Sequence, residues 1–283
     1  MRFPALPLKP QNTLLHASQL APAPAGLFVG TSGWAYNSWK PGFYPTGVSS
    51  LAFLHYYASR LTSVEVNSTF SKLPTREQLE AWLQATPPGF RFSFKAPQSI
   101  THFKRLIDTQ AAVAEFIAAL KPARIADKIG PLLFQLPPNF KADNARLAAF
   151  LKAPAFKSSI NSTKLQLAFE FRHPSWFSEP TYAILRRHNV ALCVAESDNL
   201  TTPDVRTADF ACFRLRRDGG YSSPELSAFA NRFTALTQQG EVFVYFKHED
   251  EPTGALNAVT MLCRAAKLHT TKPSTVKLKA TGD

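Results

Sequence analysis

Two glutamates, Glu65 and Glu170, stand within short apolar runs, where an isolated charged side chain is unfavourable. Each is flanked on both sides by valine or by phenylalanine. Paired carboxylates in different surroundings can divide general-acid and general-base work, because burial raises the pKa of one and a nearby cation lowers that of the other. We therefore predict Glu65 and Glu170 as catalytic residues. A structural ion-pair network is the alternative that the residues leave open.

Cations stand at or just beyond the ends of similar apolar runs: Lys95, Arg172, Arg214 and Lys247. Arg172 lies two residues after Glu170, so the two side chains share a face if the segment is extended. Lysine and arginine at such positions can bind phosphate or carboxylate groups. We predict that these four residues bind the anionic part of a substrate.

Histidines follow two of these cations. His102 comes in a loop after Lys95, and His173 directly follows Arg172. Because histidine titrates near neutral pH, we predict His102 as a general acid or base and His173 as a substrate contact. Histidines and carboxylates near the strand ends could also bind a divalent metal, but no HxH or HExxH spacing supports it. We therefore assign no metal ligand, and the cofactor is left unknown.

Neutral, acidic and aromatic groups complete the candidate site. Asn67 and Gln135 are suited to orienting a substrate, although such side chains also satisfy backbone groups in tight turns. Asp198 follows another apolar run and supplies a further carboxylate. Trp34 and Tyr36 belong to an aromatic-rich loop that could stack a base or a sugar ring, or could instead form a hydrophobic lid over the helices. We predict all five as substrate-binding residues.

The elements that must position these residues follow a repeating pattern. Eight β-branched or aromatic runs are followed by or end in polar residues: Leu27–Gly33, Ser63–Asn67, Phe90–Lys95, Ile129–Leu136, Leu165–Phe171, Val190–Ala195, Phe210–Leu215 and Val242–Phe246. Stretches with helical spacing lie between or after them: Ser50–Arg60, Arg76–Ala85, Ala111–Leu120, Asn144–Leu151, Thr181–His188, Pro224–Gln238 and Ala255–Ala266. This pattern predicts an α/β protein with a single (β/α)₈ TIM-like barrel. An open doubly wound sheet is the alternative, but Gly30–Gly33 lacks a GxGxxG fingerprint.

Alternation along the strands predicts which side chains enter the barrel. In Leu165–Phe171, the leucines and phenylalanines share one face, and Glu170 lies on the other. Glu65, Lys95 and Arg214 alternate with apolar neighbours in the same way. The apolar face should pack against the helices, so the polar face should look into the barrel. Since barrel enzymes place their chemistry at the C-terminal ends of the strands, we expect one site at that mouth.

The sequence motifs at these strand ends resemble those of a known family: GTSGWAY (30–36), VEVNSTF (64–70), FKAP (94–97), GPLLFQLPP (130–138) and FEFRHPSW (169–176). They are similar, in this order and over nearly all of residues 26–263, to the YecE-like family, known as domain of unknown function 72. The resemblance implies a TIM-like barrel and no settled activity. Some members have been likened in shape to barrel nucleases of DNA repair, which is a likeness of fold alone.

Two positions depart from the pattern of that family. After the seventh strand the family usually has Arg-Leu-His-Gly, whereas this chain has Arg214-Leu-Arg-Arg-Asp-Gly219. A histidine commonly present at the mouth is therefore replaced. After the sixth strand the usual Ala-Asp-Ser is here Ala195-Glu196-Ser197, with Asp198 next, so the carboxylate is longer or shifted.

Composition limits the setting. The chain has 283 residues, 45% hydrophobic and 18% charged, as in ordinary soluble proteins. No apolar stretch approaches the roughly 18–20 residues that cross a bilayer, and we expect no membrane partner. Cys193, Cys212 and Cys263 are widely spaced in apolar runs, which favours reduced, buried thiols and a cytoplasmic protein. The proline-broken start of the chain does not read as a secretory signal.

The formal net charge is +12, and both ends of the chain contribute to it. Residues 264–283 hold five lysines or arginines and one acid, and residues 1–25 hold two cations and no acid. Neither end has helical or strand periodicity. We therefore expect a barrel over residues 26–263 between flexible tails at 1–25 and 264–283. A basic surface favours polyanions, so a nucleic acid is one candidate partner.

Three functions remain in view. The first is an enzyme, with hydrolase or lyase as the working class, acting on a phosphate-bearing or nucleic-acid-derived substrate at the barrel mouth. The second is a non-catalytic nucleic-acid-binding protein that uses the tails and the aromatic loop. The third is a barrel scaffold whose polar interior is only structural. The partner is accordingly an anionic small molecule or a nucleic acid, and the oligomeric state is left open.

Overall fold

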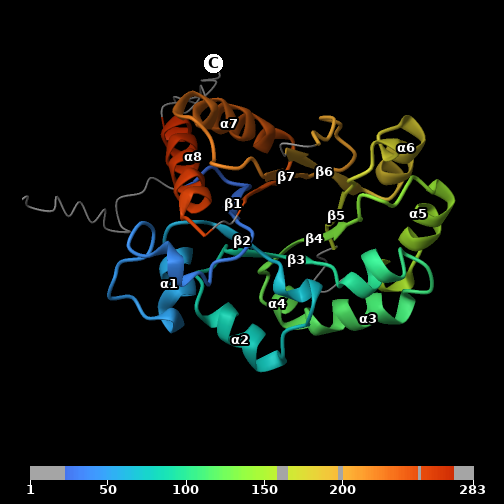
Figure 1. The fold of residues 1–283 in the computed structure, drawn as a ribbon, viewed down its shortest axis with the longest axis horizontal. Helices are drawn as coiled ribbons and strands as arrows, with labels where there is room; N and C mark the ends of the chain where they lie inside the picture. Colours follow the sequence, from blue (N-terminus) through green and yellow to red (C-terminus); the bar gives the residue numbers. More distant parts are fainter. Residues whose placement is uncertain (1–22, 158–164, 197–199, 248–249, 271–283) are drawn as a thin grey trace, which may run out of the picture.

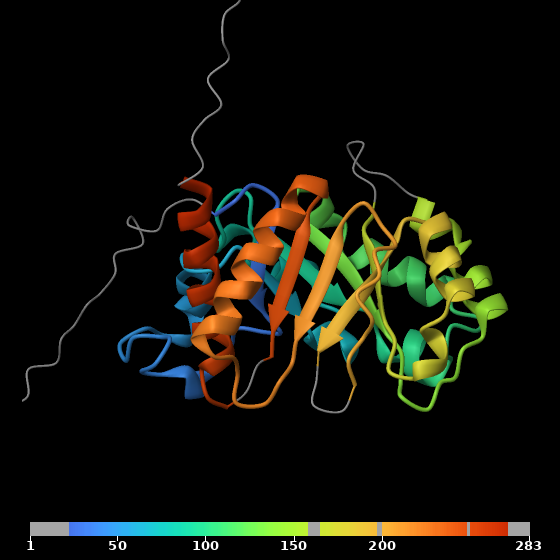
Figure 2. The same ribbon diagram turned by 90° about the horizontal axis from the view of Figure 1, so that it is seen from above.

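The computed structural model describes residues 23–157, 165–196, 200–247 and 250–270, and these form a barrel of eight parallel strands (Figures 1 and 2). The strands run in the spatial order β1-β8-β7-β6-β5-β4-β3-β2. Their bounds are β1 Leu27–Thr31, β2 Ser63–Val66, β3 Arg91–Lys95, β4 Ile129–Gln135, β5 Leu167–Glu170, β6 Val190–Glu196, β7 Ala211–Leu215 and β8 Val242–Phe246. All eight predicted strands are present, so the TIM-like barrel is confirmed.

Helices surround the sheet on its outer face (Figure 1). They are α1 Phe53–Ala58, α2 Arg76–Gln84, α3 Gln110–Ala119, α4 Lys121–Ile125, α5 Asn144–Leu151, α6 Glu179–Arg187, α7 Ser223–Leu236 and α8 Thr253–Thr270. The sequence did not predict α4, which carries Pro122 in its first turn, where proline is tolerated. Part of the expected C-terminal tail, residues 264–270, is helical because α8 continues to Thr270. The remaining expected tail segments, 1–22 and 271–283, lie outside the described residues.

Apolar side chains form two layers, one outside and one inside the sheet. Between sheet and helices lie residues such as Val64, Phe94 and Phe169, all fully buried. Inside the barrel a smaller cluster includes Leu133 and Phe243. The alternation of side chains along each strand separates the two layers, as the sequence predicted.

Above the inner apolar cluster lies a layer of hydroxyl groups. The Tyr245 hydroxyl lies 2.8 Å from Ser63 Oγ and 2.6 Å from Ser93 Oγ, and all three side chains are buried. These bonds satisfy the polar atoms that three different strands send inward. The charged groups of the mouth stand above this layer.

The barrel closes between β1 and β2 with the help of a side chain. The Tyr57 hydroxyl, from α1, accepts from Thr31 N (2.8 Å) and donates to Ser63 O (3.0 Å). A side chain at Gly30 would not fit here, since a Cβ atom would lie 1.9 Å from Ser63 O. One direct backbone bond, Thr62 N to Val29 O at 3.1 Å, adds to the closure.

The three cysteines are free thiols, and Cys193 and Cys212 are buried inside the barrel with their sulfurs 3.7 Å apart. Cys263 is half-buried. In the part of the chain that the structure describes, every helix is too short or too polar to cross a bilayer.

We expect the Tyr57→Phe substitution to lower the free energy of unfolding by about 1–3 kcal/mol, because it leaves Thr31 N–H and Ser63 C=O without the hydroxyl that bridges them. Urea denaturation measures this loss. The matched control is Tyr56→Phe on the same helix, where the side chain is only half-buried. Equal stabilities of the two variants would show that the bridge contributes nothing.

Candidate active site at the barrel mouth

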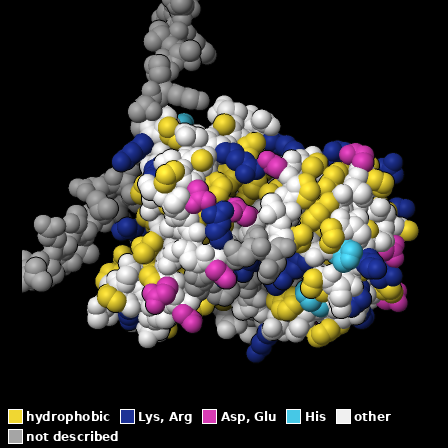
Figure 3. All heavy atoms as spheres, turned by 45° about the horizontal axis from the view of Figure 1, so that its top comes forward, with side chains coloured by type: hydrophobic (Ala, Val, Ile, Leu, Met, Phe, Trp, Pro, Cys, Tyr) yellow, Lys and Arg dark blue, Asp and Glu magenta, His cyan; other side chains and the backbone are white. Residues whose placement is uncertain are grey.

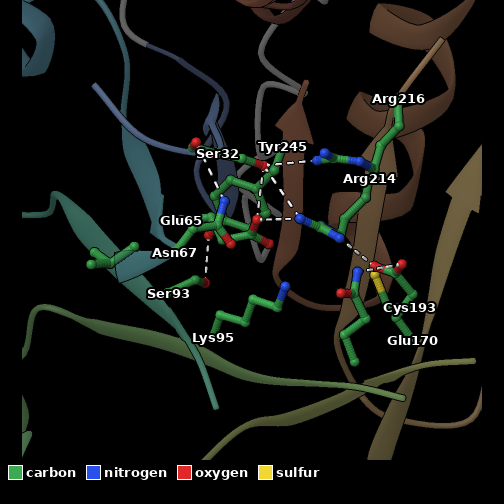
Figure 4. Close-up of polar contacts among 12 residues, drawn as sticks. Ser32, Glu65, Asn67, Ser93, Lys95, Glu170, Cys193, Arg214, Arg216 and Tyr245 are labelled. Carbon is green, nitrogen blue, oxygen red and sulfur yellow. Dashed lines mark hydrogen bonds and ion pairs between the residues drawn. The ribbon is translucent and has the colours of Figure 1, made fainter. Parts of the chain in front are cut away.

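Three charged side chains meet inside the barrel at the C-terminal ends of their strands (Figure 4). Glu65 comes from β2, Glu170 from β5 and Arg214 from β7, and each is at most 2% exposed. Arg214 Nη2 lies 2.7 Å from Glu65 Oε1, and Arg214 Nη1 lies 2.5 Å from Glu170 Oε2. One guanidinium therefore joins both predicted catalytic carboxylates.

Glu170 is further held by two neighbouring donors. Gln135 Nε2 donates to its Oε1 at 2.7 Å, and Arg172 Nε donates to the same oxygen at 3.0 Å. Burial alone would raise the pKa of Glu170, but Arg214 and Arg172 outweigh it and lower the pKa to about 2. Glu170 is therefore a carboxylate at neutral pH, and it does not serve as a proton donor there.

Glu65 is held differently and keeps one oxygen open. Its Oε1 accepts from Ser32 Oγ at 2.8 Å as well as from Arg214. Its Oε2 is buried and, among the described residues, has no hydrogen-bond partner. Asn67 donates weakly to Ser32 O at 3.4 Å, and its buried Oδ1 is likewise unpartnered within the described part of the chain. Two acceptor atoms thus stay available to a donor group of a ligand.

Cations outnumber carboxylates around this cluster. Arg216 donates to Ser32 Oγ at 3.1 Å, and Lys95 extends toward the cluster from the end of β3 (Figure 4). Burial, and then the charge of Arg214, lowers the pKa of Lys95 to about 8 and that of Arg216 to about 10. Both groups are therefore in an environment that opposes further positive charge.

His102 and Lys95 both contact the aromatic ring of Phe70. Lys95 Nζ stands 4.0 Å from the centroid of Phe70, and the His102 ring meets the same ring edge-on at 4.8 Å. His102 belongs to a single π-helical turn, Ser99–Phe103, a feature often found at functional sites. Burial, and then the charges of Lys95 and Arg172, lower the pKa of His102, which favours the neutral ring.

The aromatic first loop divides between site and core. Tyr36 reaches the site, because its hydroxyl donates to Ser32 O at 3.2 Å and the charges of Arg216 and Glu65 act on it. Trp34 instead packs edge-on against Trp82 of α2, 5.2 Å away. Nearby Tyr44 is fully buried and stacks on Phe53 at 4.1 Å. Trp34 and Tyr44 therefore pack against residues of α2 and α1, whereas Tyr36 faces the site.

Besides Trp34, three predicted substrate contacts are not shown in the cluster. Lys247 forms an ion pair with Asp218 at the rim. The His173 ring accepts from Ser175 N at 3.2 Å and caps the short turn Pro174–Trp176. Asp198 lies outside the described residues. Within the described ranges, no three His, Cys, Asp or Glu side chains gather as a metal site.

Two residues of the cluster were missing from the predicted set. Ser32 lies in the turn after β1, where serine is a common turn residue. Nothing in the sequence distinguishes a serine that only forms the turn from one that contacts the site. Arg216 follows Arg214 by two residues and so shares its strand face, a signal that could have identified it. The sequence places both arginines on this face, but only Arg214 was predicted to bind the substrate.

An external hollow of about 560 Å³ lies away from this cluster, between α2 and α4. Its lining includes Leu83, Pro122 and Ile125, and its cations, Arg76 and Lys121, are exposed. The buried ionisable groups that acid–base chemistry needs are at the mouth instead.

Comparison with known proteins places this chain in a family. The family described as "Protein of unknown function DUF72" matches residues 28–280. The chain belongs to this family. A crystal structure of a DUF72 family protein from Thermotoga maritima has a TM-score of 0.72 at 27% identity, and the match covers 86% of this chain and 99% of that one. The YecE-like resemblance is thus confirmed.

Two curated relatives of this DUF72 protein match over shorter stretches. UPF0759 protein YunF of Bacillus subtilis is 29% identical over 162 residues, which are 55% of this chain and 54% of the relative. UPF0759 protein YecE of Escherichia coli K12 is 29% identical over 155 residues, 54% of this chain and 51% of the relative. The matched part spans about half the length of each relative.

The pKa of Glu170 makes the stability of this DUF72 protein depend on pH. Its folded pKa of about 2 lies below the ordinary 4.5, so its stabilising effect is complete above pH 4.5 and is lost as the pH falls toward 2. When the pH falls from 5.5 to 3, protonation of Glu170 should lower the unfolding free energy of the native protein by about 2 kcal/mol. The Glu170→Gln variant should lack this part of the decrease.

Urea denaturation at both pH values measures this difference. Glu179→Gln, which removes an exposed partner of Arg186, is the control and should keep the pH dependence of the native protein. The same pH dependence in both variants would contradict the assignment.

Proposed function

We propose that this DUF72 protein is an enzyme that acts on a small anionic substrate, bearing phosphate or carboxylate, at the C-terminal mouth of the barrel. One observation carries the proposal. Four cations, Lys95, Arg172, Arg214 and Arg216, surround two carboxylates, Glu65 and Glu170, so the described cluster carries an excess of positive charge.

Arginine would supply most of the anion binding. Both Nη atoms of Arg214 pair with the two glutamates. The Arg172 side chain, in contrast, is 41% exposed, and Arg216 donates a hydrogen bond to a neutral serine. Guanidinium groups match the geometry of phosphate and carboxylate. An anion placed between them would also stabilise the charged form of Arg216, whose pKa is lowered by burial and then by the charge of Arg214.

Proton transfer would fall to Glu65 and His102. Glu65 Oε2 is an open acceptor next to a fixed Oε1, and the lowered pKa of His102 favours a neutral ring that can accept a proton. Glu170 would act by its charge, because its two arginine partners keep it ionised. The two carboxylates therefore differ in role, with Glu65 facing the reacting part of the substrate.

Non-catalytic nucleic-acid binding has less support. Lys and Arg side chains are spread over the face in Figure 3, with Asp and Glu between them, rather than gathered in one continuous basic patch. Two other aromatics of the first loop, Trp39 and Tyr44, are fully buried and cannot stack on a base. A purely structural polar interior remains the contrasting hypothesis, and ligand binding distinguishes it.

Inorganic phosphate should raise the melting temperature of the native protein by about 2–4 °C at ten times its dissociation constant, with ionic strength held constant. Arg216→Met should abolish this shift because it removes a cation from the mouth. Arg186→Met, on exposed α6, is the matched control and should keep it. A shift that is equal in both variants, or absent from the native protein, would contradict an anion site.

Turnover tests the catalytic part of the proposal. Sugar phosphates, nucleotides and carboxylic acids that stabilise the protein are incubated with it and followed by ³¹P and ¹H NMR. His102→Asn should lower the rate of any conversion by about 10²-fold or more while the melting shift persists. A rate unchanged in this variant would remove His102 from the reaction, and binding without conversion of any compound would leave the scaffold hypothesis as the better one.

A further inference from the structure

Lys95 has an unusual position among the lysines of this chain. It ends β3, and its side chain points into the mouth toward the ion pairs of Arg214 (Figure 4). Among the described residues, its ammonium group has no hydrogen-bond or ion-pair partner, and it lies over the face of Phe70, 4.0 Å from the ring centroid. An amine kept among cations without a carboxylate contact is poorly placed to serve as a fixed charge.

The backbone around Lys95 is held firmly. Thr69 Oγ1 donates to Lys95 O at 2.7 Å and lies 2.9 Å from Val66 O, so it ties the ends of β2 and β3 together. The next residue, Phe70, then lies under the amine and against the edge of His102. An amine and an imidazole therefore both contact the ring of Phe70.

The charges that face Lys95 come from several strands. Arg214 and Arg172 oppose its protonation, whereas Glu65 and Glu170 favour it, and burial outweighs each of them. With a pKa of about 8, roughly one amine in ten is neutral at pH 7, against about one in three thousand for an ordinary lysine at 10.5. Neutral amines are nucleophiles, and desolvation near other cations is a recognised way to produce them.

We propose that Lys95 is a nucleophile that forms a Schiff base with the aldehyde or ketone group of an anionic substrate, beside the arginines that hold its phosphate or carboxylate. This inference rests on the proposed function and narrows its substrate class to anionic carbonyl compounds. Arginine is always charged and suits the anion, whereas a lysine of lowered pKa suits covalent chemistry.

The covalent step balances without any redox partner. The lone pair of Lys95 Nζ attacks the carbonyl carbon, a C–N bond forms, and the C=O π electrons move to oxygen. One proton leaves nitrogen and one reaches that oxygen, giving a carbinolamine; His102 carries this proton. Loss of the hydroxyl group as water, with a second proton from nitrogen, then leaves C=N. The sum is an amine plus a carbonyl giving an imine plus one water.

Reductive trapping tests the proposal. The full chain is incubated at pH 7.5 with glyoxylate, pyruvate or glycolaldehyde phosphate, treated with sodium borohydride, and analysed by intact mass and peptide mapping. At least one probe should give a single adduct mapped to Lys95. Propanal, which lacks an anionic group, should label Lys95 at least tenfold less, and inorganic phosphate should suppress labelling by the anionic probes.

Variants and pH make the test independent of one substitution. Lys95→Arg should lower trapping at least tenfold. The control is Lys72→Arg, which changes an exposed lysine two residues after Phe70 and should leave trapping unchanged. In the native protein the initial trapping rate should rise between pH 6.5 and 9. Adducts spread over surface lysines, or no adduct from any probe, would overturn the proposal even if Lys95→Arg failed to fold.

The outcomes also separate this inference from the proposed function. If phosphate stabilises the protein but Lys95 is never trapped, the Schiff base is wrong and the anion site stands. If Lys95 is trapped equally well by propanal and phosphate has no effect, the amine is a nucleophile but the anionic substrate class is wrong. If neither phosphate binding nor trapping is found, both proposals fail.

Discussion

The guanidinium of Arg214 lies between two carboxylates from strands that are not its neighbours, and the barrel mouth is arranged around it. Removing three charges from water is unfavourable unless they pair closely and their remaining hydrogen-bonding positions are filled. Here Gln135 and Arg172 donate further hydrogen bonds to Glu170, while Ser32 donates one to Oε1 of Glu65. β2, β5 and β7 are thereby tied together across the barrel, at the height where a ligand would enter.

Arg214 pairs with both glutamates of the described cluster. Of the other three cations, only Arg172 also contacts one of these carboxylates, that of Glu170. Arg172 shares that glutamate, Arg216 contacts Ser32, and Lys95 rests on an aromatic ring. The mouth is thus positively charged because its cations outnumber the carboxylates that could pair with them. An anion binder with a nucleophilic amine is the chemistry that this imbalance favours.

Strand alternation predicted the fold and the inward direction of Glu65, Glu170 and Arg214, because the period of two is a property of the backbone. Beyond the strand ends that periodicity stops, and local partners decide. His173 caps its own turn and Lys247 pairs with Asp218, which no pattern could indicate. Ser32 is a site residue because the turn after β1 faces Glu65, a contact between segments 33 residues apart.

The closure between β1 and β2 has a consequence for how the chain is made. β1 pairs along five positions with β8, beginning with Leu27 opposite Val242. On its other side, toward β2, it has one backbone bond and one hydroxyl bond with Thr62 and the hydroxyl bridge of Tyr57. During synthesis, β1 therefore cannot form its hydrogen-bonded ladder until β8, the last strand, has been made. A nascent chain that ends before β8 exposes a strand edge at each end of an incomplete sheet, the kind of surface on which chaperones act.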